Sequence, residues 1–255
     1  MSQRPIGIFD SGIGGLSIAR TILNKFPHEN FIYFADTKNI PYGSKTNTEI
    51  KNYVSSVVDF LLKENVKAIV VACNTASANM NHLKLDIPLI GMIEPTCREV
   101  VKTTKNKRVL LLATEATVRS KLYSNCLKKF QITPFLFPAP EFVFLVETLM
   151  HNTAKSYELT KRLLTPFVTE DIDTVILGCT HFGFLKNEIQ KVFPEALLVD
   201  GSNEVAKELN LSLKTEPIKK GKGTFKLYTT GNDKKFIEQV KNLKIKYDQI
   251  ISVTL

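Results

Sequence analysis

Two segments of the sequence place a cysteine beside polar side chains, directly after a run of apolar residues. Cys73 lies in the segment Ala-Cys-Asn-Thr-Ala-Ser, and Cys179 lies in the segment Gly-Cys-Thr-His. A thiol near the start of a helix meets the positive end of the helix dipole, which favours the thiolate. Such a thiolate acts as a nucleophile or as a base. Each cysteine alone could instead be a small core residue at the end of a strand.

The two cysteines occupy matching places in a weak internal repeat. The interval from Asp10 to Cys73 nearly equals the interval from Thr114 to Cys179, and each of these four residues follows a predicted strand within two residues. Parallel α/β sheets bind ligands at the carboxyl ends of their strands, so two facing halves would bring both thiols to one cleft. Stereoinversion at a carbon needs one group that removes a proton and another that delivers a proton to the opposite face. Two thiols with an ordinary pKa of about 8.5 suit that chemistry.

A glycine-rich segment, Asp-Ser-Gly-Ile-Gly-Gly, begins at Asp10 after a predicted strand and before a predicted helix. Its glycines permit a tight turn whose backbone N–H groups could meet an anion. Gly12 and Gly14 fit a dinucleotide fingerprint with Asp36 as the ribose-binding acid, but Ser17 replaces the third glycine. Asp10 would also direct a carboxylate toward the pyrophosphate. We favour a small-anion or catalytic turn, and a structural turn or a nucleotide-binding module remain as alternatives.

Four further residues carry weaker signals. Tyr42, in a Pro-Tyr-Gly turn, either caps a pocket or packs in the interior. Thr114 opens a predicted helix, where it serves a substrate carboxylate or acts as an N-cap. Glu147 ends a strongly apolar run, in which an unpaired carboxylate would be costly. His181 is a core histidine or, because it lies two residues from Cys179, a group that tunes proton transfer.

Composition excludes several classes of protein. The chain has 34 Lys and Arg against 25 Asp and Glu, but the segment from Gly201 onward is rich in Lys and contains no Arg. Nucleic-acid-binding surfaces usually mix the two, so we expect no nucleic-acid partner. The four cysteines and four histidines lack zinc-type spacing, so we expect no metal. No run approaches the ~18 apolar residues of a membrane span and no signal peptide is evident, which predicts a cytoplasmic protein without a membrane partner.

Short β-branched runs alternate with longer segments of helical period, as is typical of βαβ units. The predicted strands are 6–9, 31–35, 68–72, 89–92, 109–113, 133–137, 174–177 and 197–199, and the predicted helices include 17–25, 48–64, 115–129 and 156–167. The repeat predicts an α/β fold of two similar domains with parallel sheets, related by a pseudo-two-fold axis, with the active site in the cleft between them. We assign 1–94 and 203–255 to the first domain and 95–202 to the second.

Six segments resemble those of the glutamate racemase family and occur in the family's order. They are Phe-Asp-Ser-Gly-Ile-Gly-Gly from residue 9, Ile-Pro-Tyr-Gly from 40, Ala-Cys-Asn-Thr-Ala-Ser from 72, Ile-Glu-Pro from 93, Ala-Thr-x-x-Thr-x-x-Ser from 113 and Leu-Gly-Cys-Thr-His-Phe from 177. The resemblance implies a cofactor-independent isomerase that interconverts L- and D-glutamate and supplies D-glutamate for bacterial peptidoglycan. It also implies a homodimer of two-domain α/β subunits.

The same resemblance assigns roles to individual residues. Cys73 would be the base for D-glutamate and Cys179 the base for L-glutamate, and the proton-tuning catalytic partners would be Asp10, Glu147 and His181. The implied substrate contacts are Asp10, Ser11, Pro41, Tyr42, Gly43, Asn74, Thr75, Thr114, Thr117, Thr180 and His181. Phe144 and Gly183 stand where the family commonly has Pro, a departure that concerns the shape of the local loops more than the chemistry. An aspartate racemase or a related two-cysteine enzyme is the alternative, but the Asp-Ser-Gly and Pro-Tyr-Gly segments favour glutamate.

The candidate segments also predict how a substrate would be held. They supply hydroxyls, amides and backbone N–H groups, and no Lys or Arg within them is directed at the site. Several hydrogen bonds to a charged carboxylate, each worth ~1.5–3 kcal/mol, could hold both carboxylates of glutamate. We therefore expect neutral donors rather than a clamp by Arg98 or Arg119.

Overall fold

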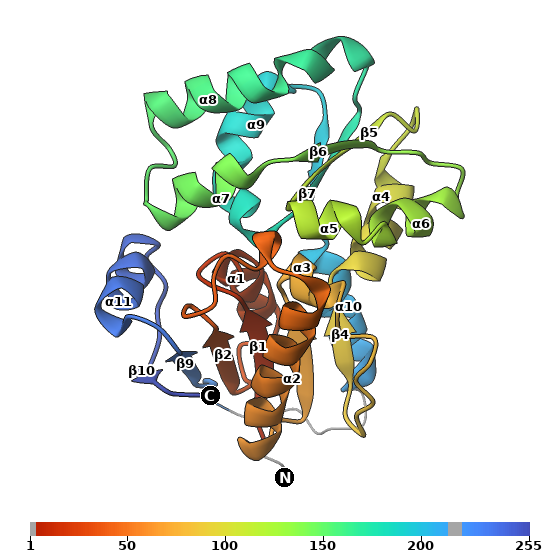
Figure 1. Cartoon of the computed structure of the whole chain (residues 1–255). Coiled ribbons are helices and arrows are strands. Elements are labelled where there is room, and N and C mark those ends of the chain that lie inside the picture. Colours follow the sequence, from red (N-terminus) through yellow and green to blue (C-terminus); the bar gives the residue numbers. More distant parts are fainter. Residues whose placement is uncertain (1–3, 214–220) are drawn as a thin grey trace.

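Six parallel strands form the larger of two sheets in the computed structural model, which describes residues 4–213 and 221–255 (Figure 1). The order across this sheet is β10-β9-β2-β1-β3-β4. Its strands are β1 (Ile6–Asp10), β2 (Phe31–Ala35), β3 (Ala68–Val71), β4 (Leu89–Gly91), β9 (Phe225–Thr229) and β10 (Gln249–Ser252). Strands β1, β2 and β3 are buried along their whole length, and apart from Asp10 at the end of β1 they are apolar, as expected where helices cover both faces of a parallel sheet.

Four parallel strands form the smaller sheet, in the order β6-β5-β7-β8. They are β5 (Val109–Ala113), β6 (Phe135–Pro138), β7 (Thr174–Gly178) and β8 (Leu197–Val199). The two inner strands, β5 and β7, are again buried throughout. The two sheets lie one above the other in Figure 1, and their connecting segments meet between them.

Helices cover the sheets because alternate strand residues face opposite sides and both sides are apolar. On the larger sheet, Ile6 and Ile8 join the cluster that contains α1 (Leu16–Lys25) and α10 (Ser202–Ser212), whereas Phe9 joins the cluster that contains α2 (Asn47–Lys63). The remaining helices are α3 (Asn74–Ser77), α4 (Ile93–Thr103), α5 (Glu115–Arg119), α6 (Leu122–Lys128), α7 (Pro140–Glu147), α8 (Ala154–Leu164), α9 (Lys186–Val192) and α11 (Asp233–Asn242), with 3-10 turns η1 (Tyr42–Ser44), η2 (Thr165–Glu170) and η3 (Thr180–Leu185).

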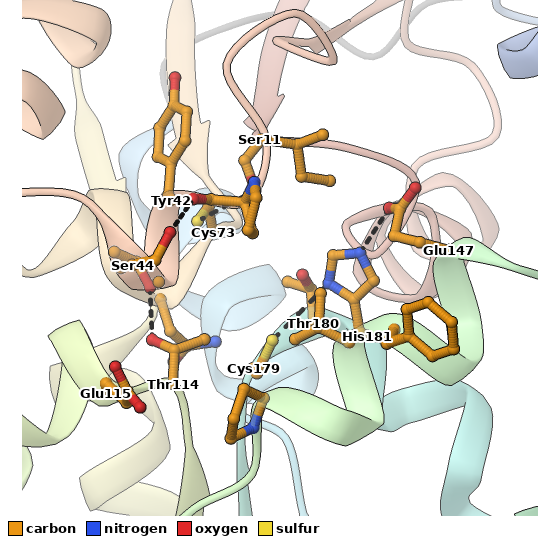
Figure 2. A pocket seen from close by; sticks show the side chains of 18 of the residues that line it. Ser11, Tyr42, Ser44, Cys73, Thr114, Glu115, Glu147, Cys179, Thr180 and His181 are labelled. Atoms are coloured by element: carbon orange, nitrogen blue, oxygen red, sulfur yellow. Dashed lines mark hydrogen bonds and ion pairs between the residues drawn. The ribbon is translucent and has the colours of Figure 1, made fainter.

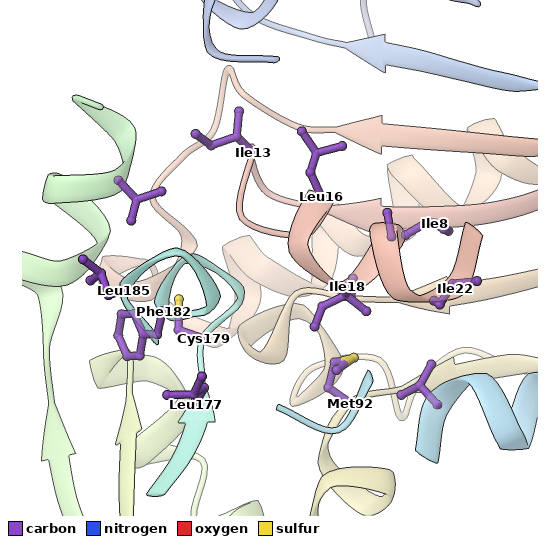
Figure 3. Close-up of a cluster of buried hydrophobic side chains, with 14 of the residues drawn as sticks. Ile8, Ile13, Leu16, Ile18, Ile22, Met92, Leu177, Cys179, Phe182 and Leu185 are labelled. Carbon is purple, nitrogen blue, oxygen red and sulfur yellow. The ribbon is translucent and has the colours of Figure 1, made fainter. Parts of the chain in front are cut away.

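One buried hydrophobic cluster is shared by the two sheets. Ile13 and Leu16, from the segment after β1, belong to the same cluster as Phe182 and Leu185 of η3 (Figure 3). The side chain of Ser17 donates a hydrogen bond to the backbone oxygen of Thr180 at 3.1 Å. The region between the two sheets is therefore a packed hydrophobic interior. This packing holds the segment after β1 against the segment after β7.

The prediction of an α/β fold with two parallel sheets is confirmed, but several predicted elements are wrong in detail. The helix predicted over 115–129 is two helices, because Lys121 adopts a left-handed conformation with φ of 58° between α5 and α6. The strand predicted over 133–137 begins only at Phe135. The helix predicted over 156–167 starts earlier and ends at Leu164, where η2 follows. Strands β9 and β10 and helix α11 were not predicted.

The chain passes from the larger sheet to the smaller through α4 and returns through α10. The division into 1–94 with 203–255 and 95–202 stays a prediction about domains, and the membership of the two sheets is compatible with it. Within the described residues, no helix combines the length and the apolar character that crossing a membrane requires.

Candidate active site

A cavity of about 290 Å³ lies between the carboxyl ends of the two sheets (Figure 2). Both cysteines line it, Cys73 after β3 of the larger sheet and Cys179 after β7 of the smaller sheet. Of the residues proposed from the sequence, those that line the cavity are Ser11, Pro41, Tyr42, Gly43, Cys73, Asn74, Thr75, Thr114, Glu147, Cys179, Thr180 and His181. Asp10 and Thr117 lie directly behind this wall and are hydrogen-bonded to residues in it.

Cys73 is the N-cap residue of the short helix α3. Its sulfur accepts a hydrogen bond from the backbone N–H of Ala76 at 3.4 Å and lies 3.8 Å from the hydroxyl oxygen of Ser11, to which the thiol donates. Burial, together with the negative charge of Asp10, raises the pKa of the Cys73 thiol to about 12. With these neighbours alone, the sulfur therefore carries a proton at neutral pH.

Cys179 begins a chain of polar contacts that runs along the cavity wall. Its sulfur lies 3.6 Å from Nδ1 of His181, and Nε2 of His181 lies 2.7 Å from Oε1 of Glu147 (Figure 2). Burial alone would lower the pKa of His181, but the hydrogen bonds and charges of Cys179 and Glu147 outweigh it and raise that pKa well above its usual value. A protonated His181 donates from both ring nitrogens, so it presents a positively charged donor to the Cys179 sulfur.

Glu147 is partly buried, yet its carboxylate stays charged. Desolvation acts to raise its pKa, but the hydrogen bonds from His181 and Gln239 and the charge of His181 outweigh desolvation, so the pKa lies below its usual value. The costly unpaired carboxylate considered from the sequence is thus avoided, because both of its oxygens have donors.

Asp10 is completely buried and joins the two sheets. Oδ1 accepts from the backbone N–H of Gly12 at 2.9 Å, and Oδ2 accepts from the hydroxyl of Thr180 at 3.0 Å. Burial raises the pKa of Asp10 despite the opposing charge of His181 and these hydrogen bonds. A carboxylate held in this way is a counter-charge for an ammonium group that enters the cavity nearby.

The glycine-rich turn packs against the other half of the chain. A Cβ atom at Gly14 would lie 2.4 Å from Oγ1 of Thr180 and 2.8 Å from the backbone nitrogen of His181, so only glycine permits this approach. Asp36, the ribose-binding candidate, is completely buried, and Tyr42 and Thr230 donate hydrogen bonds to it. These contacts argue against a nucleotide-binding turn.

Three threonine hydroxyls form a mutually hydrogen-bonded group at the cavity wall. Thr75 lies 2.8 Å from Thr114 and 3.1 Å from Thr117, and Thr114 donates to Thr117 at 2.9 Å. Thr114 also caps α5 by accepting from the backbone N–H of Thr117, so the N-cap role considered from the sequence is present in a residue that also lines the cavity. Such hydroxyls can rotate to donate to a substrate carboxylate.

Three other predicted contacts are positioned by buried neighbours. The phenol of Tyr42 donates to Asp36 at 2.5 Å and its ring is almost completely buried, so this residue packs beneath the cavity rather than capping it. Gly43 approaches the side chain of Thr114 so closely that a Cβ would lie 2.8 Å from it. Oδ1 of Asn74 accepts from Tyr123 at 2.6 Å, which fixes the orientation of the amide.

Sequence reasoning missed two residues of α11. Lys235 lines the cavity, although it lies outside the segments from which the sequence predicted neutral donors. Gln239 donates to Glu147 behind the cavity. Arg98 and Arg119 bind elsewhere, to Glu208 and to the backbone oxygen of Lys45 respectively. The signal in the sequence that could have predicted α11 is the helical spacing of the apolar residues Phe236, Val240 and Leu243. These residues lie in a lysine-rich segment that resembles a solvent-exposed tail.

In the described part of the chain, no three His, Cys, Asp or Glu side chains are grouped so as to hold a metal ion. The groups that can transfer protons around the small cavity include two thiols, an imidazole and the carboxyl groups of Asp10, Glu115 and Glu147. Two parallel sheets that each bring one such thiol to a shared cavity are the arrangement expected of a two-cysteine racemase.

Comparison with known proteins agrees with this class. The model of the Asp/Glu/Hydantoin racemase family matches residues 16–209. The chain belongs to this family.

Individual relatives resemble it over their whole length. Glutamate racemase 2 of Caldanaerobacter subterraneus is 36% identical over 265 residues, which cover 100% of this chain and 99% of the relative. The crystal structure of a glutamate racemase isoform from Bacillus anthracis superposes with a TM-score of 0.92 at 31% identity, and covers 99% of this chain and 98% of that one. The glutamate racemase of Francisella tularensis, solved in complex with D-glutamate, has a TM-score of 0.90 at 31% identity and covers 100% and 98% of the two chains.

Proposed function

We propose that this protein is a glutamate racemase that interconverts L- and D-glutamate without a cofactor, with Cys73 and Cys179 as its two bases. The observation that carries the proposal is the position of the two thiols, one from each sheet, on the wall of one small cavity. The full-length relatives named as glutamate racemases support the choice of substrate.

In the proposed reaction, the thiolate of Cys73 removes the α-proton of D-glutamate, so that an S–H bond forms as the Cα–H bond breaks. The electron pair left on Cα then takes a proton from the thiol of Cys179 on the opposite face, which yields L-glutamate. In the reverse direction the two cysteines exchange roles. Because burial and Asp10 raise the pKa of the Cys73 thiol, this base requires a bound ammonium group near Asp10 to favour its charged form.

The remaining residues hold the substrate and tune the protons. From directly behind the cavity wall, Asp10 supplies the counter-charge for the substrate ammonium, and the His181–Glu147 pair supplies a proton-donating group to Cys179. The donors proposed for the two carboxylates are Ser11, Gly43, Asn74, Thr75, Thr114, Thr117 and Thr180, with Pro41 and Tyr42 shaping the wall. These assignments rest on geometry and on the resemblance of the segments.

The proposed biological role is the supply of D-glutamate for peptidoglycan, in the cytoplasm and as a homodimer. Sedimentation of the purified protein tests the dimer, and fractionation of cells that produce it tests the location. Neither property enters the mechanism, because both thiols of the cavity come from one chain.

A circular dichroism assay tests the proposed reaction. Purified protein treated with a chelator and given D-glutamate alone should drive the ellipticity of the amino acid to zero, and the same end point should be reached from L-glutamate. Activity with aspartate but not glutamate would favour the alternative of an aspartate racemase. No loss of ellipticity with either amino acid would overturn the proposal.

A further inference from the structure

Cys179, His181 and Glu147 form a chain of polar contacts that we call the relay. Helix α11 contacts Glu147 of this relay from the opposite half of the molecule. It connects β9 and β10, which pair in the larger sheet, whereas Glu147 ends α7 beside the smaller sheet (Figure 1). Gln239 of α11 is 3% exposed. Its Nε2 donates to the backbone oxygen of Glu147 at 2.9 Å and to Oε2 at 3.1 Å.

These two hydrogen bonds determine which way the Glu147 carboxylate faces. Oε2 is directed to Gln239, so Oε1 is left to accept from Nε2 of His181, whose Nδ1 lies beside the Cys179 sulfur. Lys235 lies one helical turn before Gln239, with its ammonium 4.0 Å from Oε2, so α11 presents two groups to the same oxygen. Lys235 is largely exposed, and its contribution is correspondingly small.

We propose that Gln239 is a positioning residue for one face of the reaction: it holds Glu147 so that the His181–Cys179 pair works on L-glutamate, and the L-face base therefore depends on contact between the two halves of the molecule. This inference rests on the proposed racemase function. The D-face base has different neighbours, because Cys73 contacts Ser11 and the backbone of Ala76. A change at Gln239 should therefore act on one enantiomer.

The helix itself does not depend on Gln239 for its position. Phe236, Val240 and Leu243 belong to the large buried cluster and anchor the helix by apolar packing. Gln239→Met keeps the length and helix propensity of the side chain but removes both donors. Val240→Ala, the matched control, weakens packing of the same helix and leaves the Glu147 contact in place.

The test uses a glutamate analogue with a leaving group on the β-carbon. A single deprotonation at Cα expels this group, and hydrolysis of the resulting enamine gives 2-oxoglutarate, so each enantiomer reports one base alone. Gln239→Met should lower kcat for the L analogue about tenfold, the size expected when a hydrogen bond to a charged group is lost. For the D analogue, kcat should change by less than about twofold, and Val240→Ala should leave the ratio of the two enantiomers unchanged.

Equal losses for both enantiomers in Gln239→Met, or no loss for either, would overturn the role of Gln239. If that variant does not fold, Gln239→Glu retains the side-chain length and places a carboxylate against Glu147, and it should give the same selective loss for the L analogue. Cys73→Ser and Cys179→Ser are measured in parallel. If neither of these variants separates the enantiomers, the proposed two-base function fails whatever Gln239 does.

Discussion

At the scale of single residues, the two thiols occupy different electrostatic surroundings although they occupy matching positions. Cys73 is close to the buried carboxylate of Asp10, which disfavours its thiolate, whereas Cys179 lies beside the imidazole of His181. When two groups of the same type have different surroundings, one group can donate a proton while the other group accepts a proton. The asymmetry is therefore a property of the neighbours and not of the cysteines.

The pH dependence of Cys73 alkylation follows from this environment. In the Cys179→Ser variant without substrate, the rate of Cys73 alkylation by iodoacetamide should rise about tenfold per pH unit and should not level off below about pH 10. The sign follows from the raised pKa of about 12, because only the thiolate reacts and its fraction grows until the pH reaches the pKa. Peptide mass spectrometry distinguishes Cys73 from Cys97 and Cys126.

Asp10→Asn, introduced into the Cys179→Ser variant, tests whether the charge of Asp10 contributes to the raised pKa of Cys73. Removing the carboxylate charge should move the alkylation profile of Cys73 to lower pH, because Asp10 is one of the groups that raise its pKa. A profile that levels off near the ordinary thiol pKa before this change, or that moves upward after it, would contradict the electrostatic account.

At the scale of elements, the strand ends that carry the site were predictable and the connections between distant parts were not. Apolar runs followed by polar residues indicated β1, β3, β5 and β7, and these strands present Asp10, Cys73, Thr114 and Cys179 to the cavity side of the sheets. Strand β9 pairs with β2, which lies near the opposite end of the sequence. No local sequence pattern indicates which distant strand will pair with β9. Gln239 was missed for the same reason, because its segment matters only through its contact with Glu147.

The break between α5 and α6 shows another limit of local reasoning. Lys121 takes a left-handed conformation that glycine or asparagine adopts at lower cost. Nothing in the residue type indicates the break, so a continuous apolar period predicted one helix over 115–129. Ser120 stabilises the end of α5 by donating its hydroxyl to the backbone oxygen of Thr117 at 2.7 Å.

An aromatic pair positions the elements that carry Glu147 and His181. Phe142 of α7 and Phe182 of η3 are completely buried, with ring centroids 5.4 Å apart in an edge-to-face arrangement. Phe142→Leu should lower the free energy of unfolding by roughly 1–2 kcal/mol. It should also lower the racemisation rate about tenfold, since small displacements of catalytic groups are costly.

Phe135→Leu is the matched control for Phe142→Leu. Phe135 pairs with Phe167 at the outer side of the smaller sheet and does not line the cavity. Denaturant unfolding and racemisation assays on both variants should show a loss of stability in each but a loss of activity only in Phe142→Leu. Equal activities in the two variants would mean that the pair has no part in positioning the relay.

At the scale of the whole molecule, the cavity belongs to both sheets at once. Its walls come from the ends of β1 and β3 on one side and of β5 and β7 on the other, and a shared hydrophobic cluster lies beneath it. A ligand with two carboxylates and an ammonium group would contact both halves and would stabilise their association. Binding to the folded state alone raises stability by mass action.

Thermal unfolding measured in the presence of D-glutamate or D-aspartate tests whether the ligand links the two halves, and it also tests the choice of substrate. D-glutamate at a concentration about a hundredfold above its Kd should raise the free energy of unfolding by about 2.7 kcal/mol. Each kcal/mol raises Tm by roughly 2–4 °C in a protein of this size. D-aspartate at the same concentration should give a smaller shift, because it is one methylene shorter and spans the two sets of donors less well. A larger shift with D-aspartate would favour the aspartate racemase alternative.

The measurement that tests the account most directly is elimination from each enantiomer of the β-substituted glutamate analogue by Cys73→Ser and Cys179→Ser. Each variant should lose racemisation by on the order of 10²–10⁴-fold, the usual effect of removing a general base. Cys73→Ser should still eliminate from the L analogue, and Cys179→Ser from the D analogue. Equal damage to both enantiomers in both variants would contradict the assignment of one cysteine to each face, and full racemisation by either variant would contradict the two-base mechanism.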